Sequence, residues 1–324
     1  MYREPTYREA LGNAWRLTWR HPLVWIFGLL SIIIGQFGLS DFVGKLSVLY
    51  NQGFVGESFW AWPADWSLRV LGSGWEILSL VLNLLVLIAL IAIIIVAGVG
   101  SQGALVAISA HWYVKKKIFD TEAAWHHGIR HFWPLLLNNI LAKGITILIL
   151  LALVYLNSYV LVGSGGGSAV LFGFGFAIAL FLVLVVNSLA VYTAGYIVTE
   201  NFRYGEALRA AGEIFRHHIL VSLELSLIMV FLNILLVALI VFGSFVLIIP
   251  SVILWVIAGL TGGTVLITAG IVLAVLLFIL FIIWIGTLFN VFNTSAWIYL
   301  FMKLKHVGAV SKMSHWVERI IARE

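Results

Sequence analysis

The feature that most constrains this chain is a series of apolar stretches long enough to cross a lipid bilayer. A helix needs about 20 mainly apolar residues to span a hydrocarbon core of roughly 30 Å. Six stretches of the 324-residue chain qualify, at about 22–40, 77–100, 133–156, 169–198, 219–249 and 265–300. Only 10% of the residues are charged, against about 25% in soluble domains. The sequence therefore predicts an all-α, polytopic membrane helical bundle with six transmembrane helices.

Several stretches are longer than a bilayer is thick. As one helix, residues 264–302 would measure roughly 58 Å at 1.5 Å per residue, so that helix must tilt, kink or project. Gly98, Gly100 and Gly103 offer the second stretch a place to bend. The run Ser251–Leu260 is too short to cross, and we expect it to form an outer loop or a re-entrant segment.

Lysine and arginine are distributed unequally between the two sets of loops. Sixteen of the 19 lie before the first stretch, between the second and third, between the fourth and fifth, or after the sixth. The opposite loops hold Lys45 and Arg69. Because basic loops stay in the cytoplasm, we expect a multi-pass protein of the cytoplasmic membrane with both termini cytoplasmic. This placement accounts for the net charge of +5 without a nucleic-acid partner.

A short amphipathic segment precedes the first, third and fifth stretches. Its apolar residues recur at helical spacing, as Leu11, Trp15 and Trp19, then Trp125, Ile129, Phe132 and Trp133, then Leu208, Ala211 and Phe215. Such helices lie in the membrane interface with the apolar face toward lipid. Equivalent dipeptides, Ser109-Ala110, Thr193-Ala194 and Ser295-Ala296, occur toward the end of each unit.

These similarities predict one integral membrane domain over residues 1–324, built from three repeats of an interfacial helix plus a helical hairpin. The repeats cover about 5–114, 119–200 and 203–302, and a cytoplasmic amphipathic tail follows at 303–324. On the outer side, the segment Phe59–Trp66 holds three tryptophans. Because Trp prefers the headgroup level, we expect this segment to lie on the outer leaflet, with a binding lid as the alternative.

Lys143 and Glu224 are the amine and the carboxylate placed within the apolar stretches. Intramembrane charges are costly and usually find partners inside the bundle. Lys143 is nine residues past Pro134, and Glu224 is six past His218, the equivalent position, so we expect both within about one turn of the same depth. They form a candidate intramembrane polar pair, lining a polar cavity or buried structurally; Lys143 alternatively extends to the interface along its stem.

The stretches also contain seven asparagines, Asn83, Asn138, Asn139, Asn187, Asn233, Asn290 and Asn293. Such amides hydrogen-bond between membrane helices, and several on one inward face would make a polar path. All nine histidines lie on the predicted cytoplasmic side, and five are candidate contacts for lipid headgroups: His21, His127, His131, His217 and His218. The spacing of His127 and His131 allows metal chelation, but no further ligands support it.

We find no catalytic constellation, so no catalytic, cofactor-binding or metal-binding residue is predicted and the protein is not expected to be an enzyme. The absence of cysteine excludes thiolate chemistry. The first functional hypothesis is a non-catalytic membrane protein that organises or regulates a partner or a lipid process. Its expected partners are membrane lipids, with another membrane protein as a further candidate. The alternative is a small transporter or channel-like protein with a polar path through Lys143, Glu224 and the asparagines.

The segment Glu122-Ala123…Phe132-Trp133-Pro134-Leu135-Leu136 carries a family resemblance. It resembles the six-span membrane domain attached to some bacterial glycerophosphodiester phosphodiesterases, and related stand-alone bacterial membrane proteins. The resemblance implies a six-span membrane domain over most of the chain. The phosphodiesterase barrel with its acidic metal-binding motifs is not part of this sequence, so the resemblance does not carry hydrolase activity over.

Overall fold

The computed structural model describes residues 6–32, 74–115, 120–162, 167–261 and 264–306. These ranges hold nine α-helices and no strand, so the predicted all-α class is confirmed for this part of the chain. The helices are α1 (Thr6–Arg20), α2 (Val24–Ser31), α5 (Gly74–Lys115), α6 (Thr121–Arg130), α7 (Phe132–Val162), α8 (Gly167–Glu200), α9 (Tyr204–His217), α10 (Ile219–Thr261) and α11 (Thr264–His306).

Five of these helices, α5, α7, α8, α10 and α11, are long and apolar enough to cross a membrane. This set makes the chain a multi-pass membrane protein. The predicted first span begins with α2, and its continuation beyond Ile32 lies outside the described residues. The aromatic segment Phe59–Trp66 and the tail from residue 307 onward also lie outside them.

The prediction of an outer loop or re-entrant segment at Ser251–Leu260 is wrong. These residues continue α10, which runs unbroken to Thr261 with Pro250 inside it. In an apolar environment the backbone must satisfy its own hydrogen bonds, so continuing a helix is less costly than exposing a loop. At 43 residues each, α10 and α11 measure about 64 Å. The expectation of one overlong helix at 264–302 is therefore confirmed.

The glycines expected to bend the second stretch lie within one helix, α5, and two of them, Gly100 and Gly103, serve close packing against α6. A Cβ added to Gly103 would lie 2.8 Å from the Gly128 Cα, and one added to Gly128 would collide with the backbone oxygen of Gly100. Small residues of this kind let two helix backbones approach. Gly128, which weakens α6 as an isolated helix, is therefore required where α6 crosses α5.

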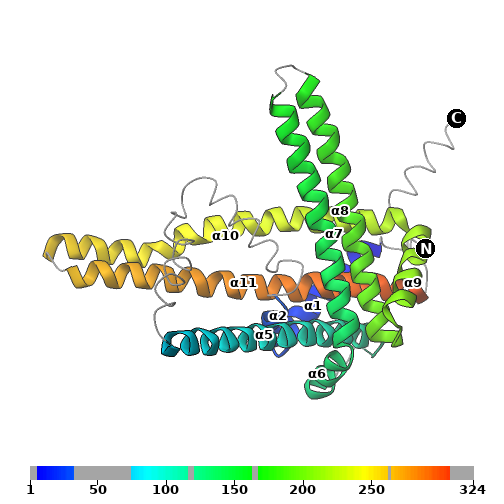
Figure 1. Ribbon diagram of the computed structural model, residues 1–324, viewed down its shortest axis with the longest axis horizontal. Coiled ribbons are helices and arrows are strands. Elements are labelled where there is room, and N and C mark those ends of the chain that lie inside the picture. Colours follow the sequence, from blue (N-terminus) through cyan, green and yellow to red (C-terminus); the bar gives the residue numbers. More distant parts are fainter. Residues whose placement is uncertain (1–5, 33–73, 116–119, 163–166, 262–263, 307–324) are drawn as a thin grey trace.

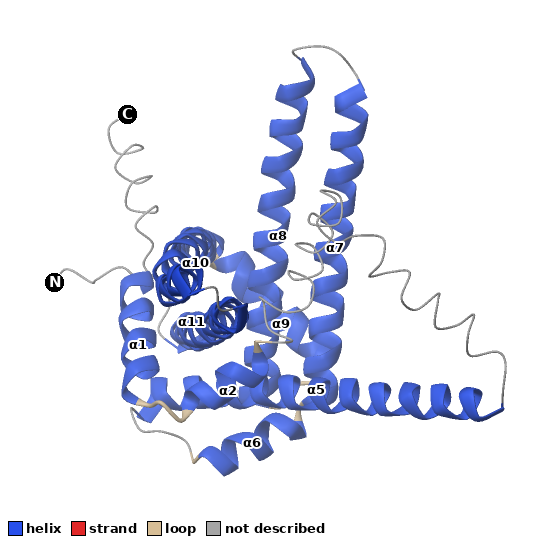
Figure 2. Ribbon diagram, turned by 90° about the vertical axis from the view of Figure 1, so that its left-hand side faces the viewer, coloured by secondary structure: helices blue, strands red, loops and turns tan. Residues whose placement is uncertain are grey.

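The buried core is concentrated at one end of the long helices, which we call the base. Buried side chains come from the C-terminal parts of α5, α8 and α11, the N-terminal parts of α7 and α10, and the short helices. The remaining lengths of the long helices, here called the arms, expose large apolar side chains. The α7–α8 hairpin, the α10–α11 hairpin and α5 leave the base in different directions (Figures 1 and 2).

Each of the three predicted interfacial helices packs against the C-terminal part of a long helix at the base. The pairs are α1 with α11, α6 with α5, and α9 with α8. In α1 the residues facing the base are Ala10, Ala14 and Leu17, while Trp15 is 58% exposed and remains available to lipid. In α9, by contrast, Ala211 and Phe215 are buried in the core, so their predicted orientation toward lipid is wrong.

Candidate polar site at the base of the bundle

Where α2, α5, α8 and α11 meet, the base holds a small cavity of about 40 Å³, lined by apolar and by neutral polar side chains. Most of its polar lining comes from α11 and α5, and the described residues that line it include no ionisable group. The lining residues are Ser31, Gln102, Val106, Val191, Ala194, Asn290, Asn293, Thr294 and Trp297. The arrangement offers neutral hydrogen-bond donors and acceptors, which suits binding of a small neutral group rather than acid–base chemistry.

Asn290 joins α11 to α2 beside this cavity. Its Nδ2 donates to the backbone oxygen of Gly28 at 2.9 Å and to Ser31 Oγ at 2.7 Å. Gly28 permits this contact, because a Cβ there would collide with Val291 and lie 3.0 Å from the Thr287 oxygen. The buried amide therefore holds two helices that are about 260 positions apart in sequence.

A second amide pair joins α5 to α7. Asn139 Nδ2 donates to Gln102 Oε1 at 2.6 Å, and Gln102 Nε2 donates to Asn139 Oδ1 at 3.3 Å. Next to it, Asn138 Nδ2 donates to the Ala190 oxygen of α8 at 3.0 Å. Of the other predicted asparagines, Asn83 is exposed on its arm and Asn233 bonds back to Met229 of its own helix. The asparagines thus divide into a group at the base and others along the arms.

Sequence reasoning missed several residues of this region, namely Ser31, Gln102, Ser222, Ser226 and Trp297. The hydroxyls of Ser226 and Ser222 lie 3.0 Å from Ser188 Oγ and 2.8 Å from Tyr192 Oη, and so link α10 to α8. The available signal was weak, since isolated Ser and Gln residues in apolar helices are common. Only the positions of the neighbouring helices show which of them face each other.

Lys143 and Glu224 are both half-buried, on α7 and α10. Lys143 lies eleven residues past the start of α7, about 17 Å along the axis, and Glu224 five residues past the start of α10, about 8 Å. Because α7 and α10 leave the base in different directions (Figure 1), the expectation of a similar depth in the membrane stays a prediction. Their pairing stays a prediction.

His127 and His131 connect α6 to the end of α8. His127 Nε2 donates to the Val198 oxygen at 2.8 Å, and His131, 6% exposed, hydrogen-bonds through both ring nitrogens. Its Nδ1–H must donate, because the partner is the backbone oxygen of His127, while its Nε2 lies 2.8 Å from Asn201 Oδ1. Asn201 adopts a left-handed φ of 56°, which Asn tolerates.

The other three predicted imidazoles lie at the surface of the base. His21 is half-buried against the Trp112 ring, with ring centroids 5.3 Å apart, and burial followed by the Arg20 charge lowers its pKa. Burial and the neighbouring His217 likewise lower the pKa of His218. His217 is exposed, with Nδ1 donating to the Glu213 oxygen at 2.8 Å. Contact of these five histidines with headgroups stays a prediction.

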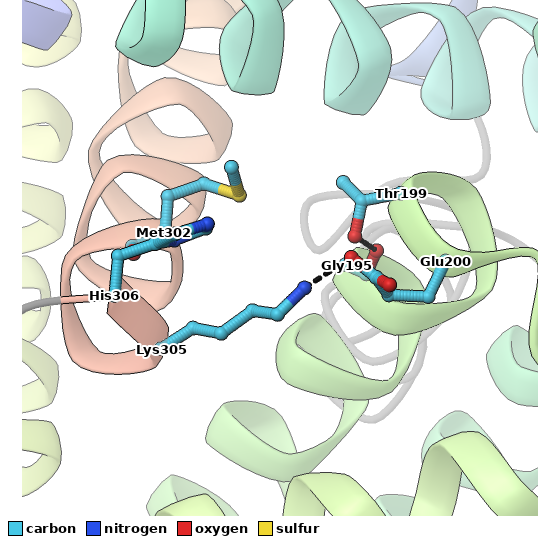
Figure 3. Close-up of polar contacts among 6 residues, drawn as sticks. All are labelled: Gly195, Thr199, Glu200, Met302, Lys305 and His306. Atoms are coloured by element: carbon cyan, nitrogen blue, oxygen red, sulfur yellow. Dashed lines mark hydrogen bonds and ion pairs between the residues drawn. The ribbon is translucent and has the colours of Figure 1, made fainter.

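Two ion pairs tie the C-terminal end of α11 to its neighbours. Lys303 pairs with Glu9 of α1, and Lys305 pairs with Glu200 at the end of α8 (Figure 3). Lys305 also lies 5.9 Å from the centre of the Tyr196 ring. These contacts join the C-terminal end of α11 to the first and second predicted repeats at the rim of the base.

No protein-family model, curated protein or solved structure matches the chain. The protein class therefore rests on the structure alone, whose described residues form a multi-pass, all-α membrane protein. Its base holds a small cavity lined in part by neutral polar side chains, and its apolar arms leave that base in different directions.

Proposed function

We propose that this protein is a non-catalytic membrane module that organises or regulates a partner protein or a lipid process in a bacterial cytoplasmic membrane. The observation that supports this is the division between base and arms. The chain uses its base for its own packing, while the arms expose apolar side chains such as Phe174, Phe242 and Leu260. Such surface is available to lipid chains and to the helices of another membrane protein.

The finer architecture belongs to the same proposal: six spans, arranged as three repeats of an interfacial helix plus a hairpin. The packing of α1, α6 and α9 supports it. The helices α6 and α9 each pack on the long helix that precedes them in the chain, α5 and α8 respectively. The helix α1 packs instead on α11, the last long helix that the structure describes. The resemblance to the membrane domain of glycerophosphodiester phosphodiesterases is compatible with this architecture.

The base also presents basic and aromatic side chains that fit the headgroup region. Arg16, Arg20, Arg130, Arg209 and Arg216 are exposed on or next to the interfacial helices, as are Trp15 and Trp133. Juxtamembrane basic residues are attracted to anionic lipids, and Trp prefers the interface. The proposal therefore places the base at the cytoplasmic surface, in agreement with the distribution of Lys and Arg.

Site-specific photo-crosslinking in native membranes tests the proposed function. A photoreactive phenylalanine analogue replaces Phe174 and Phe242 on the arms, which are 69% and 71% exposed, and Phe301 in the core as the matched control. We expect the two arm positions to capture one recurrent membrane protein, or one lipid class enriched over bulk lipid, and Phe301 to capture neither. Adducts that match bulk lipid composition at both arm positions would contradict the proposal.

Orientation is tested separately, because the chain has no cysteine and any introduced thiol is unique. Ser164→Cys lies in the predicted loop between α7 and α8, and Asp120→Cys lies just before α6. An impermeant thiol reagent added to intact cells is expected to label the first and not the second. Labelling of Asp120→Cys alone would reverse the proposed topology.

The alternative function is a small transporter or channel-like protein with a polar path through Lys143, Glu224 and the asparagines. The gathering of Asn139, Asn290 and Asn293 at or beside the cavity favours it. Purified protein in vesicles, with Lys143→Met plus Glu224→Leu as the test variant, separates the two functions. Flux of an ion or small solute that this variant abolishes with its fold intact would favour transport.

A further inference from the structure

The indole N–H of Trp297 presents an unsatisfied hydrogen-bond donor in the base. Trp297 is 1% exposed, and its Nε1 has no hydrogen-bond partner in the described part of the protein. The same residue lines the polar cavity together with Gln102, Asn290 and Thr294. A buried donor left without an acceptor is unfavourable, and native proteins normally satisfy it with protein atoms or an ordered water.

Acceptor atoms are available around this cavity. Gln102 Oε1 accepts one hydrogen bond from Asn139 and, as a carbonyl oxygen, has a second lone pair. Asn290 uses its Nδ2 for Gly28 and Ser31, which leaves its Oδ1 as a further acceptor. A molecule that accepts from Trp297 and donates to these oxygens would complete the network.

The size and charge of the cavity decide what that molecule is. A cavity of about 40 Å³ exceeds the roughly 10–15 Å³ that one water needs, so it is large enough to hold ordered water. An ion of either sign would need a counter-charge, because moving a bare charge out of water is far more costly than ordering a neutral molecule. The described lining residues include no charged group. A neutral hydrogen-bonding molecule fits, and an ion does not.

We propose that this cavity is a binding site for ordered water, held between Trp297 Nε1 and the amide oxygens of Gln102 and Asn290. The water links Gln102 of α5 to Asn290 and Trp297 of α11. Asn290 also bonds to α2, and Gln102 also bonds to Asn139 of α7, so the water joins these two sets of hydrogen bonds. The site is independent of the proposed scaffolding function. A water held in this way is part of the packing of the base, so the cavity is not an open path for solutes.

Hydroxyl-radical footprinting by X-ray radiolysis tests the site, because bound water generates radicals next to buried side chains. The full-length protein in nanodiscs is irradiated, and oxidation is read by mass spectrometry of its peptides. Tyr192, completely buried and with its ring 6.0 Å from that of Trp297, is the matched control that does not line the cavity. We expect Trp297 to be oxidised at least tenfold faster than Tyr192.

Val106→Ile adds one methylene to the lining and should displace the water, which lowers Trp297 oxidation severalfold while Tyr192 stays unchanged. A Trp297 as unreactive as Tyr192 in the original protein would show a dry cavity and overturn the proposal. Equal and fast oxidation of both residues would show general solvent penetration and overturn it as well. Unchanged Trp297 oxidation in a folded Val106→Ile protein would show that the water is not in this cavity and would also overturn the proposal.

Discussion

The side-chain oxygens of Ser109 and Ser295 lie 3.1 Å apart inside the base, within hydrogen-bonding distance, although 186 positions separate them in the chain. Both belong to the dipeptides predicted to be equivalent between repeats. Thr193, from the third such dipeptide, is completely buried on α8, and α5, α8 and α11 all contact one another. Contact between two of the equivalent positions, with the third buried on a neighbouring helix, is compatible with the proposed three-repeat organisation.

Gly128→Ala is expected to destabilise the protein by about 1–3 kcal/mol, the usual cost of overpacking. The added Cβ would meet the backbone of Gly100 and Ala104 rather than a movable side chain. Gly212→Ala in α9 is the control, since a Cβ there meets nothing within 4 Å; it should be neutral or stabilising by up to about 1 kcal/mol. Thermal unfolding in detergent measures both, and equal midpoints would contradict the packing role of Gly128.

Asn139→Leu should cost about 1–3 kcal/mol, because it leaves the half-buried amide of Gln102 without its partner. The double variant Gln102→Leu with Asn139→Leu should regain part of that loss, since it removes both polar groups. A thermal-unfolding double-mutant cycle reports the coupling between them. Strictly additive effects of the two substitutions would argue against the amide pair.

The two ion pairs at the end of α11 should contribute modestly. Partly exposed pairs are typically worth about 0.2–1 kcal/mol and weaken with salt. Lys303–Glu9 is less exposed than Lys305–Glu200 and should contribute more. Exchanging the charges in Lys305→Glu with Glu200→Lys should restore stability lost in either single variant. Failure of the exchange to restore the unfolding midpoint at low salt would count against a direct pair.

Acidification should destabilise the base through His21 and His218, whose pKa values are lowered from 6.5, chiefly by burial. Below pH 6.5 the unfolded chain binds protons on these groups before the folded protein does, so stability falls as pH falls toward the folded pKa values. Unfolding midpoints between pH 7.5 and 5.5 measure the loss. The double variant His21→Gln with His218→Gln should flatten that dependence; a slope unchanged from the original protein would assign it to other groups.

The long, uninterrupted apolar stretches determined that the described chain is helical and membrane-spanning, because in lipid the backbone must bond to itself and a helix does so locally. The expected positions of α7, α8 and α11 and the unbroken length of α11 required no tertiary information. The segment Ser251–Leu260 could not be assigned by length alone, since a helix already long enough to cross can simply continue.

The tertiary structure decided which polar residues meet. Asn290 bonds to Gly28, and Asn139 to Gln102, because particular helix faces cross at the base. Nothing in the spacing within one helix distinguishes these residues from the exposed Asn83. The same reason explains Phe215, which periodicity placed toward lipid and α9 packing placed in the core. Periodicity identifies the apolar face of a helix, whereas only the neighbouring helices determine whether that face meets lipid or protein.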